Sequence, residues 1–145
     1  IDALGQLIRC KTISYSDHSL EDDAEFEKLI SLLPSLYPHV YAHCTLQRMP
    51  DRGLLFRWPG KTEGEPAVMM AHYDVVPVTD GWDHDPFLGE VVDGSIYGRG
   101  AVDTKSTMVC ALRALENALK NNYVPNNDLY LLYSLFYQLY WISLG

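Results

Sequence analysis

Apolar residues recur at helical spacing in three parts of the chain. Near the start, Leu4, Leu7 and Ile8 share one helical face, and Phe26, Leu29, Ile30 and Leu33 follow the i, i+3, i+4, i+7 pattern. The first pattern predicts a short helix. The second predicts a helix that begins near residue 19 and ends between the prolines at 34 and 38. A third apolar stripe predicts a helix over residues 103–120, with an acid at its start and Lys120 at its end.

Four runs of residues have the composition of strands. Residues 40–48, 53–58 and 67–71 are separated by turn-rich segments, and residues 129–134 follow the third predicted helix. The run 67–71 is apolar throughout, which is typical of a strand buried on both faces inside a sheet covered by helices. Asp93 and Gly94 lie between two β-rich segments and predict a hairpin.

Composition indicates one globular domain. The chain has 145 residues, of which 48% are hydrophobic and 21% charged. Its net charge of −8 argues against nucleic acid or an anionic membrane as a partner, because both attract basic surfaces. The three cysteines include no C-x-x-C pair, so we expect a reducing, cytoplasmic compartment. The first residues show no signal-peptide pattern, and we expect an internal start.

Acidic residues are concentrated between residues 72 and 103, which contain seven acids, one basic residue and two histidines. Such a segment is either a solvated loop or a metal site. His72 and Asp74 directly follow the apolar run, and the period of two puts both on one side at the carboxyl end of the strand. A metal ligand oriented by a carboxylate would suit that position. The alternative is a histidine that caps the strand end, with Asp74 in a turn.

Asp103 is the second candidate metal ligand. A carboxylate there could bridge two cations, or it could be an ordinary acid at a helix start. The preceding Gly98-Arg99-Gly100 loop lacks the spacing of either phosphate-binding motif, so nucleotide binding is not expected. No role is assigned to three further histidines, which are His18, His39 and His43.

Three ordered motifs together resemble one known family. They are Met70-Ala71-His72-Tyr73-Asp74-Val75-Val76-Pro77, Gly81-Trp82-Asp83-His84-Asp85-Pro86-Phe87 and Tyr97-Gly98-Arg99-Gly100-Ala101-Val102-Asp103-Thr104-Lys105. They resemble the dizinc metallopeptidase family of aminoacylases, carboxypeptidase S, glutamate carboxypeptidase and succinyl-diaminopimelate desuccinylase. The middle motif is most similar to the carboxypeptidase S and N-acyl amino acid hydrolase branch. The resemblance implies an α/β fold, namely a truncated, partial three-layer α/β/α zinc-exopeptidase-like catalytic domain with a mixed sheet.

The resemblance also implies a site and an activity. His72 would bind one zinc ion, Asp103 would bridge two zinc ions, and Asp74 would be a catalytic-site residue that holds His72. Cobalt or manganese would suit the same donors. The implied reaction is hydrolysis of a small peptide or an N-acyl amino acid at the amide bond next to a free carboxylate. The alternative is a non-catalytic metal-binding or interaction module. The family's homodimer forms through a lid domain that has no counterpart in this sequence.

The end of the chain departs from the family. Where the family has an acidic Asp-Glu-Glu run, this sequence has Phe136-Tyr137-Gln138, and none of these side chains can act as a general base near neutral pH. We therefore expect residues 1–134 to be the N-terminal part of a catalytic domain, 135–145 to be an atypical aromatic tail, and the 145-residue chain to be incomplete and inactive. As a membrane anchor the tail is disfavoured, because a spanning helix needs about 20 apolar residues.

Overall fold

The computed structural model describes residues 1–135. It contains a 3₁₀ turn at His18–Leu20 and four α-helices, which are α1 (Asp2–Ile8), α2 (Asp23–Leu36), α3 (Pro38–His43) and α4 (Lys105–Lys120). The strands in these residues are β1 (Thr45–Arg48), β2 (Leu54–Trp58), β3 (Ala67–His72), β4 (Glu90–Val92), β5 (Ser95–Tyr97) and β6 (Leu129–Ser134).

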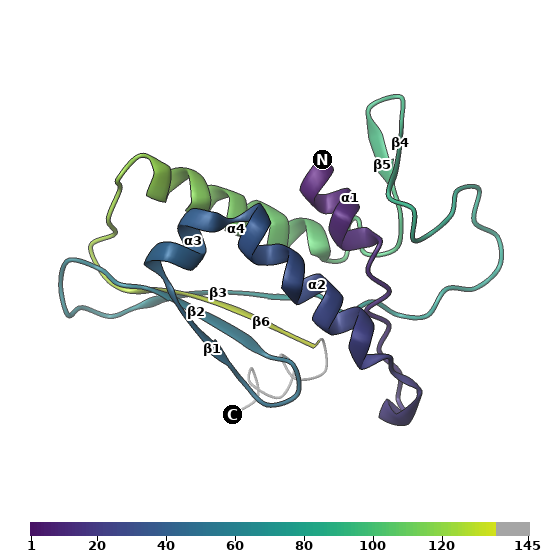
Figure 1. Ribbon diagram of the computed structural model, residues 1–145, viewed down its shortest axis with the longest axis horizontal. Helices are drawn as coiled ribbons and strands as arrows, with labels where there is room; N and C mark the ends of the chain where they lie inside the picture. The colour runs from purple at the N-terminus through teal and green to yellow at the C-terminus, as the bar shows by residue number, and fades with distance from the viewer. Residues whose placement is uncertain (136–145) are drawn as a thin grey trace.

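Four strands form a mixed sheet in the order β1-β2-β6-β3. β6 is antiparallel to β2 and parallel to β3, so the last described strand lies between two earlier ones. All four helices lie on one side of this sheet (Figure 1). The predicted α/β class and the mixed sheet are confirmed. Of the three predicted layers, residues 1–135 form the sheet and one helical layer.

The hydrophobic core fills the space between the helices and the sheet. The ring of Phe56 on β2 meets the ring of Tyr133 on β6 edge to face, with centroids 6.2 Å apart. From the helices, Phe26, Leu33 and Leu112 are fully buried against this layer. Each such side chain contributes about 1.5–3 kcal/mol by leaving water, so the central pairing of β6 is held mainly by apolar burial.

The strand predicted for residues 40–48 is wrong in its first half. Residues Pro38–His43 form α3, and only Thr45–Arg48 is extended. Pro38 suits the first turn of a helix because its missing N–H would have no partner there. The buried carboxylate of Glu116 on α4 accepts the backbone N–H groups of His39 and Val40, both at 3.0 Å. This tertiary cap outweighs the local strand pattern.

The burial predicted for β3 is also wrong. Val68, Met69 and Met70 are 56%, 47% and 48% exposed. β3 is the end strand of the sheet order in the described part of the chain, where it pairs with β6 alone. The apolar run does form a strand, but nothing within residues 1–135 covers both of its faces.

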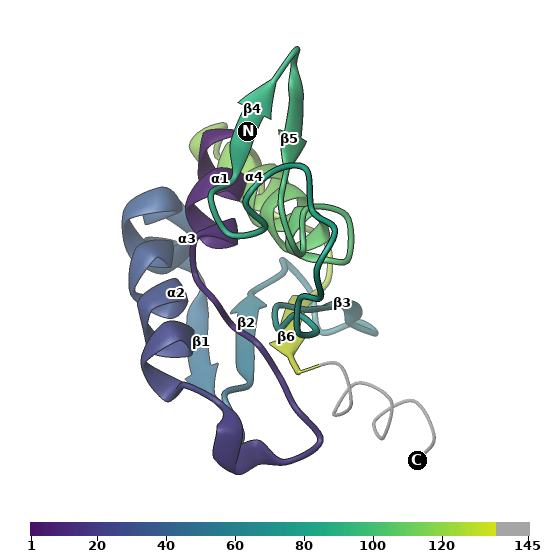
Figure 2. The same cartoon turned by 90° about the vertical axis from the view of Figure 1, so that its right-hand side faces the viewer.

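The remaining expectations concern the hairpin and the tail. β4 and β5 pair through Asp93 and Gly94, whose φ angles of 50° and 77° are those of a tight hairpin turn, so that prediction is confirmed. The hairpin projects away from the sheet (Figure 2). Apart from Leu135, the aromatic tail and its Phe136-Tyr137-Gln138 run lie outside the described residues. Within residues 1–135, no helix has the length and apolar character needed to cross a bilayer.

A buried lysine joins the start of α4 to the end of α1. The Lys105 side chain is fully buried, and its Nζ donates to the backbone oxygens of Leu7 at 2.9 Å and Cys10 at 2.7 Å. Burial lowers the pKa of Lys105 to about 8. Each of these carbonyls at the end of α1 also accepts one backbone N–H, that of Cys10 for Leu7 and that of Thr12 for Cys10, so the buried amine gives each a second hydrogen bond. The two hydrogen bonds of the Lys105 amine therefore hold the start of α4 against the end of α1.

Replacing Lys105 by Met should destabilise the fold. Methionine keeps the apolar stem but removes both hydrogen bonds that the buried amine makes, at a cost of about 1–3 kcal/mol. Urea unfolding would measure this loss. Lys120→Met is the matched control on the same helix, where the side chain is half exposed, and it should change the free energy of unfolding by less than about 0.5 kcal/mol. Equal effects of the two substitutions would contradict the role given to Lys105.

Candidate metal centre

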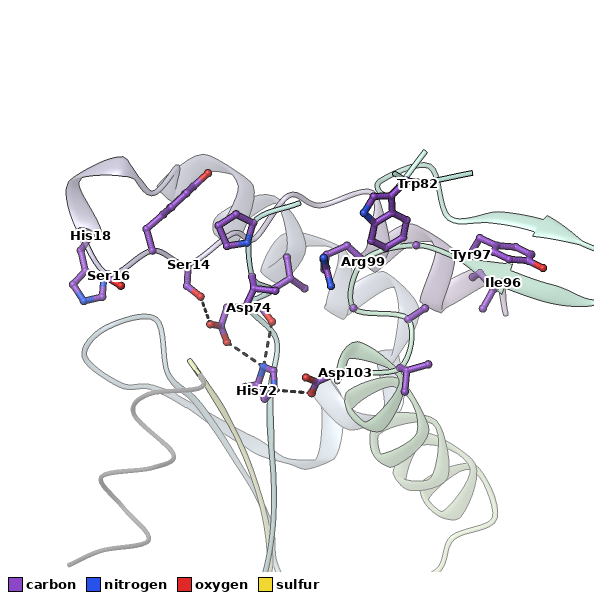
Figure 3. A pocket seen from close by; sticks show the side chains of 18 residues that line it. Ser14, Ser16, His18, His72, Asp74, Trp82, Ile96, Tyr97, Arg99 and Asp103 are labelled. Atoms are coloured by element: carbon purple, nitrogen blue, oxygen red, sulfur yellow. Dashed lines mark hydrogen bonds and ion pairs between the residues drawn. The ribbon is translucent and has the colours of Figure 1, made fainter. Parts of the chain in front are cut away.

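At the end of β3, successive side chains point alternately into the core and into a cavity. Tyr73 points inward, where its buried ring meets Phe26 edge to face at a centroid distance of 6.0 Å. His72 and Asp74 therefore project to the opposite side, as the period of two predicts. Figure 3 shows both side chains at the wall of the cavity.

The segment after α1 pairs with the chain beyond β3 and holds Asp74. Val75 donates its N–H to the carbonyl of Thr12 at 2.8 Å, and Ser14 donates its N–H to Val75 at 3.0 Å. This pairing brings the Ser14 hydroxyl to 2.5 Å from Asp74 Oδ2. Ser14 was not identified from the sequence, because its contact with Asp74 spans 60 residues and leaves no local pattern.

His72 lies between two carboxylates. Its Nδ1 is 3.2 Å from both Oδ1 and the backbone oxygen of Asp74, and its Nε2 is 3.1 Å from Asp103 Oδ1. The Asp74 side chain is 2% exposed, whereas that of Asp103 is 86% exposed. Burial lowers the pKa of His72, but the hydrogen bonds and charge of Asp74 raise it more, and the net pKa lies above the ordinary value.

Asp103 reaches His72 because the preceding loop passes close to the sheet. Gly100 has a φ of +86°, and a Cβ on it would lie 2.8 Å from Val75 Cγ1, so a larger residue would push the loop away. Its carbonyl accepts the N–H of Lys105 at 3.0 Å. The helix predicted to begin at Asp103 begins at Lys105 instead, and Asp103 lies in the turn before it.

A cavity of about 850 Å³ opens over these residues. One side presents Ser14, His72, Asp74 and Asp103, and the other presents Trp82 and Tyr97 (Figure 3). The guanidinium of Arg99 stacks on the Trp82 ring at 5.0 Å. The cavity thus combines a charged wall with an aromatic wall, an arrangement typical of a small-molecule site.

The donor set agrees in part with a metal site. His72 Nε2 and Asp103 Oδ1 face each other, and Asp74 occupies the other ring nitrogen, as a carboxylate that orients a histidine ligand does. Within residues 1–135, no group of three or more His, Cys, Asp or Glu side chains converges to hold a metal ion. Two ligands are fewer than the three that catalytic zinc sites take from protein.

A comparison with models of protein families identifies the family that this part of the chain matches. Residues 68–134, which include His72, Asp74 and Asp103, match the model for peptidase family M20/M25/M40. These residues belong to that peptidase family. The resemblance of the three motifs to a family of hydrolases and metallopeptidases is thereby confirmed.

Curated relatives agree with this kinship. Probable carboxypeptidase S-like 1 of Dictyostelium discoideum is 36% identical over 125 residues, which is 83% of this chain and 26% of the relative. The N-fatty-acyl-amino acid synthase/hydrolase PM20D1 of Bos taurus is 36% identical over 137 residues, which is 90% of this chain and 26% of the relative. The chain thus spans about a quarter of the length of these relatives.

Solved structures share the fold. The M20 family metallo-carboxypeptidase Sso-CP2 from Sulfolobus solfataricus superposes with a TM-score of 0.71 and 24% identity over 92% of this chain and 30% of that one. Human carnosine dipeptidase 1 gives a TM-score of 0.73 with 16% identity, covering 92% and 31%. The arrangement of helices and mixed sheet is therefore that of the M20 catalytic domain.

If Asp74 orients His72 for a metal ion, Asp74→Asn should lower the zinc affinity of this site by about 10- to 100-fold. Asparagine keeps the size but loses the charge behind the imidazole. Calorimetry would measure the change for the zinc-binding step that His72→Ala removes. Asp80→Asn removes an exposed acid from the same acidic segment, and it should leave the affinity unchanged. Equal losses in the two variants would show that only the general negative charge matters.

Proposed function

We propose that this chain forms the N-terminal part of a metal-dependent hydrolase that cleaves a peptide or N-acyl amide bond next to a free carboxylate. The observation that carries the proposal is the contact between His72 Nε2 and Asp103 Oδ1 at 3.1 Å, with Asp74 on the other ring nitrogen, inside a region that matches the M20 family. His72 and Asp103 would hold the metal ion, zinc being the expected one.

Each of the three residues has a task that its surroundings support. Asp74 is buried and held by Ser14, so it can fix the ring of His72 and keep Nε2 directed at Asp103. The exposed carboxylate of Asp103 has room for a second cation. A divalent metal bound there would polarise the amide carbonyl and lower the pKa of a bound water.

The cavity supports a substrate with an apolar acyl or side chain. Trp82, Ile96 and Tyr97 form its aromatic and aliphatic wall opposite the charged residues. The bovine relative is named as an N-fatty-acyl-amino acid synthase/hydrolase, and others are named as carboxypeptidases. We propose an N-acyl amino acid with an apolar acyl group, or a small peptide with an apolar residue, as the substrate class.

The 145-residue chain alone should not turn over such substrates. Two observations support this part of the proposal: residues 1–135 bring no third metal ligand to His72 and Asp103, and the sequence has Phe136-Tyr137-Gln138 where the family has its general base. The same observations favour the second candidate, a non-catalytic metal-binding or interaction module that keeps the fold.

A chimera distinguishes the two candidates. Residues 1–134 would replace the corresponding quarter of the full-length carboxypeptidase S-like 1 relative, and the zinc-loaded chimera would be assayed with N-acyl amino acids and dipeptides. We expect hydrolysis, and His72→Ala in the chimera should lower kcat/KM by about a thousandfold, as the loss of about 4 kcal/mol of transition-state stabilisation would. Asp80→Asn, an exposed position outside the cavity lining, should leave kcat/KM unchanged.

Two results would count against the proposal. A chimera that folds and binds zinc but hydrolyses nothing would favour the non-catalytic module. Robust turnover by the 145-residue chain itself, lost in His72→Ala, would contradict the proposed inactivity of this form.

A further inference from the structure

A second pair of histidines lies on α3, away from the cavity. His39 and His43 are four residues apart, so they share one face of the helix. Their ring centroids are 6.3 Å apart and their planes differ by 4°. The strand predicted for residues 40–48 contains His43 but not His39, and in an extended chain the two residues would be about 13 Å apart. The closeness of the two rings therefore depends on α3, which the sequence did not predict.

The surroundings of the two rings fix which nitrogen carries the proton. His39 Nδ1 is 2.7 Å from Oε1 of Glu116, and His43 Nδ1 is 2.9 Å from the backbone oxygen of His39. Both oxygens can only accept, so each neutral ring holds its proton on Nδ1 and has its lone pair on Nε2. Within residues 1–135, no hydrogen bond to either Nε2 is made.

Glu116 is built into the structure behind His39. Its side chain is fully buried, and its other oxygen, Oε2, accepts the backbone N–H groups of His39 and Val40. Lys120 Nζ approaches Oε1 only to 4.0 Å. A buried carboxylate on the Nδ1–H of a histidine is the arrangement that orients metal-binding imidazoles and increases their basicity. Here it holds one of two adjacent imidazoles.

We propose that His39 and His43 form a surface site for a divalent transition-metal cation of the zinc, nickel and copper class, with Glu116 as the positioning residue. Imidazole nitrogen is a preferred donor for these ions. Bonds of about 2.0–2.1 Å require the two Nε2 atoms to come within about 4.2 Å of each other. The rings are stacked with centroids 6.3 Å apart, so binding would rotate them until both Nε2 atoms face one ion.

This site is separate from the proposed hydrolase centre. Neither histidine lines the cavity that contains His72 and Asp103. Two protein ligands leave the other coordination positions to water, so binding should be weaker than in a closed four-ligand site. A bound ion would join successive turns of α3 and so stabilise this helix.

The test titrates Zn²⁺ into the full chain carrying His72→Asn, so that the candidate metal centre does not contribute. Calorimetry should show saturable binding of one ion, and His43→Asn should weaken it at least tenfold. Glu116→Gln, checked for folding by circular dichroism, should weaken binding about tenfold. With one equivalent of Cu²⁺, electron paramagnetic resonance should show two coupled imidazole nitrogens, reduced to one by His43→Asn.

Two control variants keep the test specific. His84→Asn removes a histidine whose Nδ1 also contacts a carboxylate, that of Glu90 at 2.9 Å, and it should leave the affinity unchanged. The double variant Ala42→His, His43→Ala keeps the number of histidines but breaks the four-residue spacing, and it should bind as weakly as His43→Asn. The absence of saturable binding, or equal affinity in the spacing variant, would overturn the proposal.

Discussion

The buried amine of Lys105 joins the first helix of the chain to the last described one, and the position of Asp103 depends on that bond. Lys105 Nζ donates to the carbonyls of Leu7 and Cys10 at the end of α1, while its backbone N–H donates to the carbonyl of Gly100. The turn between Gly100 and Lys105 is thus held at both ends, and Asp103 lies inside it. A carboxylate that is 86% exposed would otherwise have little to fix its place.

The other side of the site depends on the sheet. β3 pairs in parallel with β6, and the segment containing Thr12 and Ser14 continues the pairing beyond the end of β3. Three distant parts of the chain therefore meet at His72: the first loop, the strand end and the turn before α4. The arrangement is that of the M20 fold, and open α/β sheets bind ligands at the carboxyl ends of their strands. The exposed apolar side chains of β3 show that residues 1–135 do not complete this fold.

Much of the fold, and the placing of His72 and Asp74 together, could be predicted from the sequence, because both depend on patterns between residues close in the chain. Helical stripes marked α1, α2 and α4, an Asp-Gly pair marked the hairpin, and the period of two placed His72 beside Asp74. The errors have a common cause in contacts between distant residues. Glu116 converts part of a predicted strand into α3, and Ser14 reaches Asp74 across 60 residues. The predicted burial of β3 was wrong because an apolar run shows only that a strand can pack on both faces. It does not show that the described part of the chain supplies the covering elements.

The account rests on His72 and Asp103 binding the same metal ion, and a double-variant zinc titration tests this most directly. In a His43→Asn background, calorimetry would compare the chain with its His72→Ala, Asp103→Ala and doubly substituted forms. Two ligands of one ion are strongly coupled, so each single substitution should lower the zinc affinity at least about tenfold, and the double should be little worse than either. Unchanged affinity in one single variant, or losses that simply add, would contradict a shared ion.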